Sequence, residues 1–263
     1  MPEPKFPPAT PLKPRRRAIV VGASSGIGAA LARRLAHEGY SLALLARREK
    51  QLKALCEEIN TASGETRACY YVHDVSDYAA VPDLLHHILT DLGGLDLFIY
   101  NAGIQHFVAP DEFNFAVDRE MIEINTLGAL AWLNPVAAMF QAMKAGHIVG
   151  VSSVAGDRGR VGAPAYNTSK AALTTYLEAL RNRLTRRGVA VLTVKPGPVD
   201  TDILRAAGPE RRNLWVISPD QAADGIWKAI RARKQTVYIP GQWGLLMLVI
   251  RHIPSVIFRR LSF

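Results

Sequence analysis

Cysteine is scarce in this chain: Cys56 and Cys69 are the only two among 263 residues. Two cysteines are too few for the disulfide network that holds small secreted domains together. We therefore expect two free thiols in a reducing compartment. Hydrophobic residues make up 49% of the chain, which is enough for a fold that is stabilised by its core.

Long apolar runs are also missing. The sequence has no stretch of about 18 apolar residues, so we expect no membrane-spanning segment. Residues 1–17 contain six prolines and lack the apolar segment of a signal peptide. We interpret residues 1–17 as a disordered arm rich in Pro and Arg, and we expect a cytoplasmic protein.

Acidic residues are outnumbered: 32 Lys and Arg stand against 23 Asp and Glu, which gives a formal net charge of +9. This balance favours phosphates or anionic lipid as partners. The sequence has no DNA- or RNA-binding motif, which argues against nucleic acid. Its seven histidines are scattered, so no metal site is expected.

Strand-like and helix-like segments alternate along the chain. Strands are expected at 18–21, 41–45, 69–72, 95–100, 147–151, 189–194 and 236–239. Helices are expected at 27–38, 49–60, 78–92, 118–143, 165–187 and 219–233. The strands are continuous apolar runs, which is typical of strands buried on both faces. The pattern predicts a single α/β domain at 18–240, a doubly wound parallel sheet of the Rossmann type with helices on both faces.

A glycine-rich turn joins the first strand to the first helix. Glycine permits tight turns and close approach of the backbone, and the start of a helix offers free N–H groups to a pyrophosphate. The spacing differs from the commonest dinucleotide fingerprint. The position still predicts a nucleotide site made by Gly22, Ser24, Ser25, Gly26, Ile27 and Gly28.

No carboxylate stands at the end of the second expected strand, which is followed by Ala46, Arg47 and Arg48. NAD sites place an acid there to hold the ribose hydroxyls, but this chain has Arg47 and Arg48. Arg47 could bind a 2′-phosphate through two parallel hydrogen bonds, with Ser24 as a second donor. We therefore predict NADP(H) as the cofactor; the alternative is that Arg47 is a solvated surface charge.

Tyr166 and Lys170 lie four residues apart, on one face of an expected helix. An ammonium beside a phenol favours the phenolate and lowers the pKa of the tyrosine from its reference value of about 10. Such a tyrosine can act as an acid or a base near neutral pH. Two serines, Ser152 and Ser153, lie upstream of this pair.

Taken in order, these motifs resemble the short-chain dehydrogenase/reductase family. Besides the glycine turn, the matching elements are Asp74-Val75, Asn101-Ala102-Gly103, Asn125, Ser152-Ser153, Tyr166 with Lys170, and Pro196-Gly197-Pro198-Val199-Asp200-Thr201. The resemblance runs from residue 18 to about residue 201. It implies oxidoreduction between an alcohol and a carbonyl group, and a homo-oligomer, dimer or tetramer, formed through helices 118–143 and 165–187.

The resemblance also implies roles for single residues. Ser153 and Tyr166 would be catalytic, with Tyr166 as the acid in reduction. Lys170 would hold the nicotinamide ribose and lower the pKa of Tyr166, and Asn125 would hold a water that relays protons to Lys170. The cofactor would also contact Asp74 and Val75 at its adenine, Asn101, Ala102 and Gly103 along the cleft, and Pro196, Gly197, Val199 and Thr201 at its nicotinamide.

Residues 241–263 form an unusual tail. Trp243–Ile250 is apolar almost all round but too short to span a membrane, and Arg251, Arg259 and Arg260 interrupt the remainder. We interpret it as an amphipathic segment lying on anionic lipid at the inner face of a membrane. The alternatives are that it packs on a partner subunit or covers the active site.

The tail is also similar to that of reductases acting on decaprenyl-phospho-2-keto-pentose, as is segment 152–158. We therefore predict an NADPH-dependent carbonyl reductase for an apolar or lipid-linked ketone, such as a polyprenyl-phospho-keto-sugar. One alternative is a reductase of 3-oxoacyl thioesters, steroids or small ketones. A second is an NADP-binding regulator without catalysis.

Overall fold

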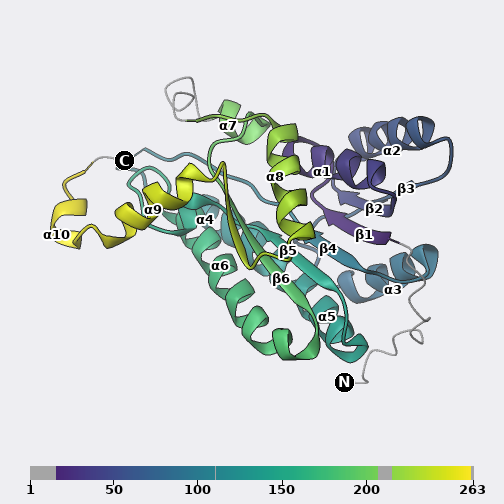
Figure 1. Cartoon of the computed structure of the whole chain (residues 1–263). Coiled ribbons are helices and arrows are strands. Elements are labelled where there is room, and N and C mark those ends of the chain that lie inside the picture. The colour runs from purple at the N-terminus through teal and green to yellow at the C-terminus, as the bar shows by residue number, and fades with distance from the viewer. Residues whose placement is uncertain (1–15, 110, 207–214, 262–263) are drawn as a thin grey trace.

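The computed structural model describes residues 16–109, 111–206 and 215–261. A seven-stranded parallel sheet forms its centre, in the order β3-β2-β1-β4-β5-β6-β7 (Figure 1). The strands are β1 (Arg16–Val21), β2 (Tyr40–Ala46), β3 (Ala68–Val72), β4 (Leu97–Tyr100), β5 (His147–Val151), β6 (Ala190–Pro196) and β7 (Thr236–Ile239). The chain builds outward from β1 to β3 and then reverses at β4. In such sheets a ligand binds outside the strand ends at this point of reversal.

Helices cover both faces of the sheet, as the continuous apolar strands predict. One core lies under α1 (Gly26–His37), α2 (Glu49–Ser63) and α8 (Pro219–Arg231). The opposite core lies under α3 (Val81–Leu92), α5 (Gly128–Met143) and α6 (Pro164–Leu184). Along β1, Ala18 and Val20 pack into the first core, whereas Ile19 and Val21 pack into the second. This alternation follows from the two-residue period of a strand.

The first strand begins at Arg16, two residues before the expected start. Arg17 is paired with Ser41 in the sheet register, and its buried guanidinium donates to the carboxylate of Asp96 at 2.9 Å. This ion pair extends the strand beyond its apolar residues. The arm expected at 1–17 otherwise lies outside the described residues.

The single helix expected at 118–143 is wrong. The chain instead forms α4 (Phe115–Ile122), a π-helical turn η1 (Glu123–Leu127) and then α5. Asn125 lies inside η1 with its side chain fully buried. A π turn inserts an extra residue into a helix, and such turns occur often at functional sites.

The tail forms two helices after β7: α9 (Gln242–His252) and α10 (Ser255–Phe258). Figure 1 shows them, in yellow, beyond the end of α6 and away from α2 and α3. Across the described segments, none of the helices combines the length and apolar character needed to cross a bilayer.

The carboxyl ends of the parallel strands meet along one edge of the sheet. The glycine turn follows β1, Asn101 follows β4, and Ser152 follows β5. Gly197 follows β6 at the same edge. The fold therefore gathers motifs that lie up to 175 residues apart in the sequence, from Gly22 to Gly197.

Candidate active site

A cavity of about 810 Å³ runs along this edge of the sheet. One end of the cavity is lined by the glycine turn and by the residues after β2. The cavity passes the ends of β4, β5 and β6 and ends against α9. Every cofactor and catalytic residue expected from the sequence lines it except Gly28 and Asn125, which lie behind the lining residues.

The glycine turn has the backbone geometry of an anion cradle. Gly22 and Gly26 have φ of +86° and +55°, which side chains other than glycine rarely adopt. A Cβ on Gly28 would collide with the carbonyl oxygen of Gly22, and the Asn101 amide donates to that oxygen at 2.8 Å. The first turn of α1 carries no acid. Its N–H groups and dipole therefore suit a pyrophosphate.

Arg47 and Arg48 both lie at the nucleotide end of the cavity. Arg47 is 56% exposed and forms an ion pair with Asp74 at 3.5 Å. Arg48 donates to the Ser24 hydroxyl at 3.0 and 3.1 Å and also contacts Ser25. Arg47, the residue expected from the sequence to bind the phosphate, is thus joined at this end of the cavity by Arg48, which was not expected there. Adjacency to Arg47 was the signal in the sequence that could have identified it.

Asp74 follows β3, beside the buried Val75. Burial raises the pKa of Asp74, but hydrogen bonds from Ser76 and the charge of Arg47 outweigh burial. The pKa of this carboxyl is therefore lowered, and Asp74 is ionised at neutral pH. An ionised carboxylate here can accept hydrogen bonds from an adenine amine.

Asn125 holds together the floor of the catalytic end. It accepts from the Ile104 N–H at 2.8 Å, and its amide donates to the Ile104 carbonyl at 2.9 Å. The same amide donates to the Ser169 hydroxyl at 3.0 Å. A Cβ on Gly103 would come within 3.1 Å of both Asn125 Oδ1 and Lys170 Nζ. Gly103 therefore permits the close approach of these two polar groups.

The two neighbouring serines have different surroundings. Ser152 is buried and its hydroxyl bonds the Lys170 carbonyl at 2.9 Å and the Thr174 hydroxyl at 2.8 Å, so it ties β5 to α6. Ser153 lines the cavity and caps the short turn η2 (Val154–Gly156), accepting from Ala155 N–H at 3.0 Å. This difference agrees with Ser153 as the reactive member of the pair.

Lys170 is buried, and its ammonium donates to the Val151 carbonyl at 3.1 Å. Burial lowers the pKa of Lys170 to about 8. The ammonium lies 5.8 Å from the centre of the Tyr166 ring. The i and i+4 positions on α6 thus bring the two side chains together, as predicted.

The predicted lowering of the Tyr166 pKa by Lys170 is wrong for this structure. Burial raises the pKa of Tyr166. A hydrogen bond with Ser153 and the charge of Arg160 act in the opposite direction without cancelling it. Arg160 lines the same cavity and donates to the Asn167 side chain at 3.2 Å. It is a cation near Tyr166 that the sequence analysis missed.

The expected nicotinamide side is formed by the segment after β6. Pro196, Gly197, Val199 and Thr201 all line the cavity. The Gly197 N–H bonds the Ile239 carbonyl at 2.9 Å, and the Trp243 indole lies directly against Gly197. The start of α9 is therefore packed on the site itself.

Arg158 fastens the far end of α9. Its guanidinium donates to the carbonyls of Arg251 at 3.0 Å and Ile253 at 2.9 Å. It also lies 4.4 Å from the centre of the Phe258 ring. A cation suits these carbonyls because the C-terminus of a helix carries partial negative charge. One side of α9 therefore covers the cavity, as one of the alternatives from the sequence expected, while Leu245, Leu248 and Val249 on its other side are exposed.

Asp157, the neighbour of Arg158, forms a buried polar cluster. It pairs with Lys195 at 2.5 Å and accepts from the Tyr238 hydroxyl at 2.7 Å. Only 3% of the Asp157 side chain and 7% of the Lys195 side chain are exposed. The cluster joins the segment after Ser153 to β6 and β7.

The catalytic end of the cavity is apolar and basic. Its apolar wall is formed by Ile104, Phe107, Val154, Ile203, Leu204, Trp243, Leu246, Met247, Ile250 and Phe258. Arg158, Arg160 and Lys170 supply the cations. Along the described wall the carboxylates are Asp74 and Asp202, and both pair with arginines at the nucleotide end. In the described chain, no group of His, Cys, Asp and Glu is arranged to hold a metal ion.

Comparisons with known proteins agree with this geometry. The family model for short chain dehydrogenase matches residues 16–212. An uncharacterized oxidoreductase of Myxococcus xanthus is 38% identical over 243 residues, which cover 92% of this chain and 94% of the relative.

Two solved structures share the fold at similar identity. Actinorhodin polyketide ketoreductase, solved with NADPH, is 25% identical with a TM-score of 0.79, and the match covers 88% of this chain and 97% of that one. A short-chain dehydrogenase of Sphingobium yanoikuyae in complex with NADPH is 26% identical with a TM-score of 0.78. The match covers 91% of this chain and 97% of that one.

Proposed function

This chain belongs to the short-chain dehydrogenase/reductase family and is an oxidoreductase, and from this premise we propose that it reduces an apolar ketone with NADPH. The observation that carries the proposal is the continuous cavity of about 810 Å³ at the edge of the sheet. It joins a nucleotide cradle to Ser153, Tyr166 and Lys170, and then to an apolar wall. Its residues fit a dinucleotide at one end and a carbonyl compound with a large apolar part at the other.

The bound nicotinamide supplies the hydride. The carbonyl oxygen of the ketone gains negative charge as its carbon is reduced. Ser153 and Tyr166 are placed to donate hydrogen bonds to that oxygen, and Tyr166 then gives it a proton. Tyr166 is half-buried at the wall of the cavity, and hydrogen bonds that are shielded from water in this way are stronger than those in open solvent.

Lys170 and Asn125 would restore the proton on Tyr166. The ammonium of Lys170 would hold the ribose of the cofactor, and its lowered pKa of about 8 would make it a ready proton donor. Asn125 anchors the backbone at Ile104 beside this ammonium. From there it can hold a water that carries protons to Lys170.

The enzyme binds NADP(H) and, we propose, prefers it to NAD(H). Arg47 and Arg48 line the nucleotide end of the cavity, where they could hold the 2′-phosphate of NADP, and they occupy the two positions directly after β2 in place of an acid that could accept from a 2′-hydroxyl. The Ser24 hydroxyl, now bonded by Arg48, adds a donor. The solved relatives named above were crystallised with NADPH, which supports this choice.

We propose a ketone with a large apolar group as the substrate. A polyprenyl-phospho-keto-sugar is the most specific candidate, because apolar side chains and two arginines share the catalytic end of the cavity. A 3-oxoacyl thioester, a steroid or a small ketone is the second candidate. The polyketide ketoreductase among the structural relatives favours this broader class.

The oligomer and the location are also proposed. We expect a dimer or tetramer formed through α5 and α6, because these long helices are the family's usual contact surfaces. The two free thiols, Cys56 and Cys69, fit a reducing compartment such as the cytoplasm. The tail would bring the enzyme to the inner face of a membrane.

NADPH oxidation with a panel of ketones tests the proposal. We expect turnover of apolar ketones with NADPH and much weaker turnover with NADH. Tight NADPH binding without oxidation by any ketone of the panel would favour the regulator without catalysis. Turnover only of small polar ketones would contradict the apolar substrate class.

A further inference from the structure

Helix α9 has two apolar faces. Trp243, Leu246, Met247 and Ile250 recur at three- and four-residue steps and line the cavity. Leu245, Leu248 and Val249 occupy the opposite face and are 74%, 56% and 64% exposed. A helix at the surface of a globular protein normally presents polar residues to water. The exposed apolar face therefore points to a missing partner.

The exposed apolar surface continues past α9. Val256 and Ile257 on α10 are 55% and 52% exposed, and Leu261 is also exposed. Phe258 instead turns inward against Arg158. We call Leu245, Leu248, Val249, Val256 and Ile257 the outer face of the tail.

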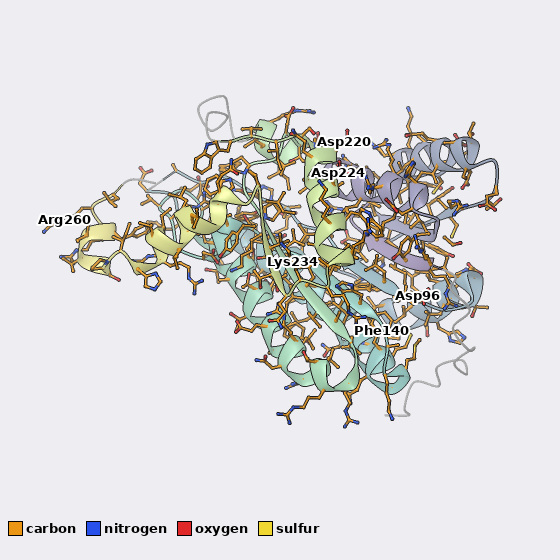
Figure 2. The ribbon with its side chains drawn as sticks, in the orientation of Figure 1. Asp96, Phe140, Asp220, Asp224, Lys234 and Arg260 are labelled. Carbon is orange, nitrogen blue, oxygen red and sulfur yellow. The ribbon has the colours of Figure 1, made fainter. Side chains whose placement is uncertain are left out.

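Positive charge surrounds this outer face. Arg251, Arg259 and Arg260 are exposed, and residues 241–263 contain no Asp or Glu. Arg260 lies at the end of the molecule where α10 projects from the body (Figure 2). The partner must therefore be apolar inside and negatively charged at its surface.

A second copy of this chain fits poorly. In a twofold contact the same patch meets itself. The arginines of one tail would then face those of the other, with no acid of the tail between them. An anionic lipid surface matches both properties, since its acyl region takes the apolar side chains and its headgroups pair with the arginines.

We propose that the outer face of the tail docks the protein on an anionic lipid bilayer, with α9 as the partition between the bilayer and the cavity. At 11 residues α9 is about 16 Å long and lies in the interface rather than crossing it. A ketone dissolved in the bilayer then reaches Tyr166 by passing beside α9. This last step rests on the proposed function, whereas docking itself does not.

Vesicle flotation tests the docking. The probes are vesicles of phosphatidylcholine alone and of phosphatidylcholine with phosphatidylglycerol. The full chain should float with the anionic vesicles and less with the neutral ones. For the variant Leu245→Gln/Leu248→Gln/Val249→Gln, the partition coefficient between anionic vesicles and water should fall roughly tenfold or more. The variant Arg259→Gln/Arg260→Gln should lose the preference for anionic vesicles.

Two matched variants serve as controls. Val72 is 52% exposed on β3, at the opposite edge of the sheet from β7, which leads into the tail, so Val72→Gln should float like the wild type. Arg186→Gln/Arg187→Gln removes two arginines next to α6 and should keep the anionic preference. Every variant should oxidise NADPH normally with a water-soluble ketone in the absence of vesicles.

The outcomes separate docking from catalysis. Absence of flotation in the wild type, or flotation of the outer-face variant at the wild-type level, would overturn the docking. A second copy would be the occupant if the wild type does not float and the outer-face variant has a smaller particle mass than the wild type in light scattering. Flotation without ketone reduction would support docking and reject the proposed function.

Discussion

At Tyr166, burial and its polar neighbours act on the pKa in opposite directions. Burial raises the pKa, whereas the hydrogen bond with Ser153 and the charge of Arg160 lower it. A high pKa keeps the phenol protonated, which suits an acid in ketone reduction. The same property makes Tyr166 a poor base for alcohol oxidation near neutral pH.

Arg160→Gln should shift the pH profile in both directions of the reaction. Loss of the positive charge raises the pKa of Tyr166 further. Oxidation of an alcohol requires the phenolate. The midpoint of the increase in kcat/KM with pH should therefore shift to higher pH by about one unit. Reduction of a ketone requires the protonated phenol. The midpoint of the decrease in kcat/KM at high pH should therefore shift to higher pH by the same amount.

Arg160→Lys is the matched control, because it keeps the charge and should restore most of the wild-type profile. Measurement of log kcat/KM against pH in both directions distinguishes this effect from a structural one. Identical profiles for the Gln variant and the wild type would rule out Arg160 as an influence on Tyr166.

The closeness of Tyr166 and Lys170 was predictable from the sequence because both lie on α6, four residues apart, whereas Ser153, on the turn after β5, was named from the family resemblance. The arginines at 48, 158 and 160 were not predictable in the same way. A long arginine side chain can reach in many directions, and its neighbours decide which one it takes. For Arg158 those neighbours are Arg251 and Ile253, more than 90 residues further along the chain.

At the scale of elements, the segment after Ser153 holds the last strand and the tail together. Asp157 binds Lys195 on β6 and Tyr238 on β7, and Arg158 binds the end of α9. One short segment therefore connects the reactive serine to the wall of the substrate cavity.

Asp157→Asn should destabilise the fold. It leaves the Lys195 ammonium buried without a counter-charge, which costs about 3–5 kcal/mol. Urea unfolding measures this loss. Asp224→Asn is the control, since its pair with Arg34 is half exposed at the carboxylate and should cost less than about 1 kcal/mol. Equal losses in both variants would contradict the role of the buried cluster.

Arg158→Gln should loosen α9 without unfolding the sheet. We expect the KM of a bulky apolar ketone to rise by about tenfold, because the two charge-assisted hydrogen bonds that hold the end of α9 become neutral ones or are lost. The Kd of NADPH should change little. Hydrogen exchange of residues 242–252 should become faster. The exposed Arg183→Gln on α6 should leave all three measurements unchanged.

The order of strands and helices was predictable because the length and spacing of apolar residues differ between strands and helices. The π turn at Glu123–Leu127 was not, because its cause lies in another part of the chain. Asn125 must turn inward to meet the Ile104 backbone, and only the folded chain brings Ile104 to that position.

At the scale of the whole molecule, the sheet edge unites the nucleotide cradle, the catalytic side chains and the tail in one cavity. Burial on both faces of every central strand made the doubly wound sheet predictable from composition and spacing. The covering of the cavity by α9 was only one of three alternatives, because an apolar stretch does not specify what it packs against.

NADPH should stabilise the whole fold more than NADH does. A ligand at 100 times its Kd adds about 2.7 kcal/mol to the free energy of unfolding. Arg48→Ala should raise the Kd of NADPH about tenfold or more and leave that of NADH almost unchanged. Thermal unfolding with each cofactor measures both effects. Equal stabilisation of the wild type by the two cofactors would contradict the proposed preference.

The role of Tyr166 as the group that protonates the ketone is tested by comparing NADPH oxidation by Tyr166→Phe with that by Tyr176→Phe. Both changes remove one hydroxyl from α6, but Tyr176 bonds Asn134 on the surface, away from the cavity. We expect Tyr166→Phe to bind NADPH normally and to lose turnover of an apolar ketone by about 100-fold or more, with Tyr176→Phe close to the wild type. Normal turnover by Tyr166→Phe would show that another group protonates the ketone and would contradict the proposed mechanism.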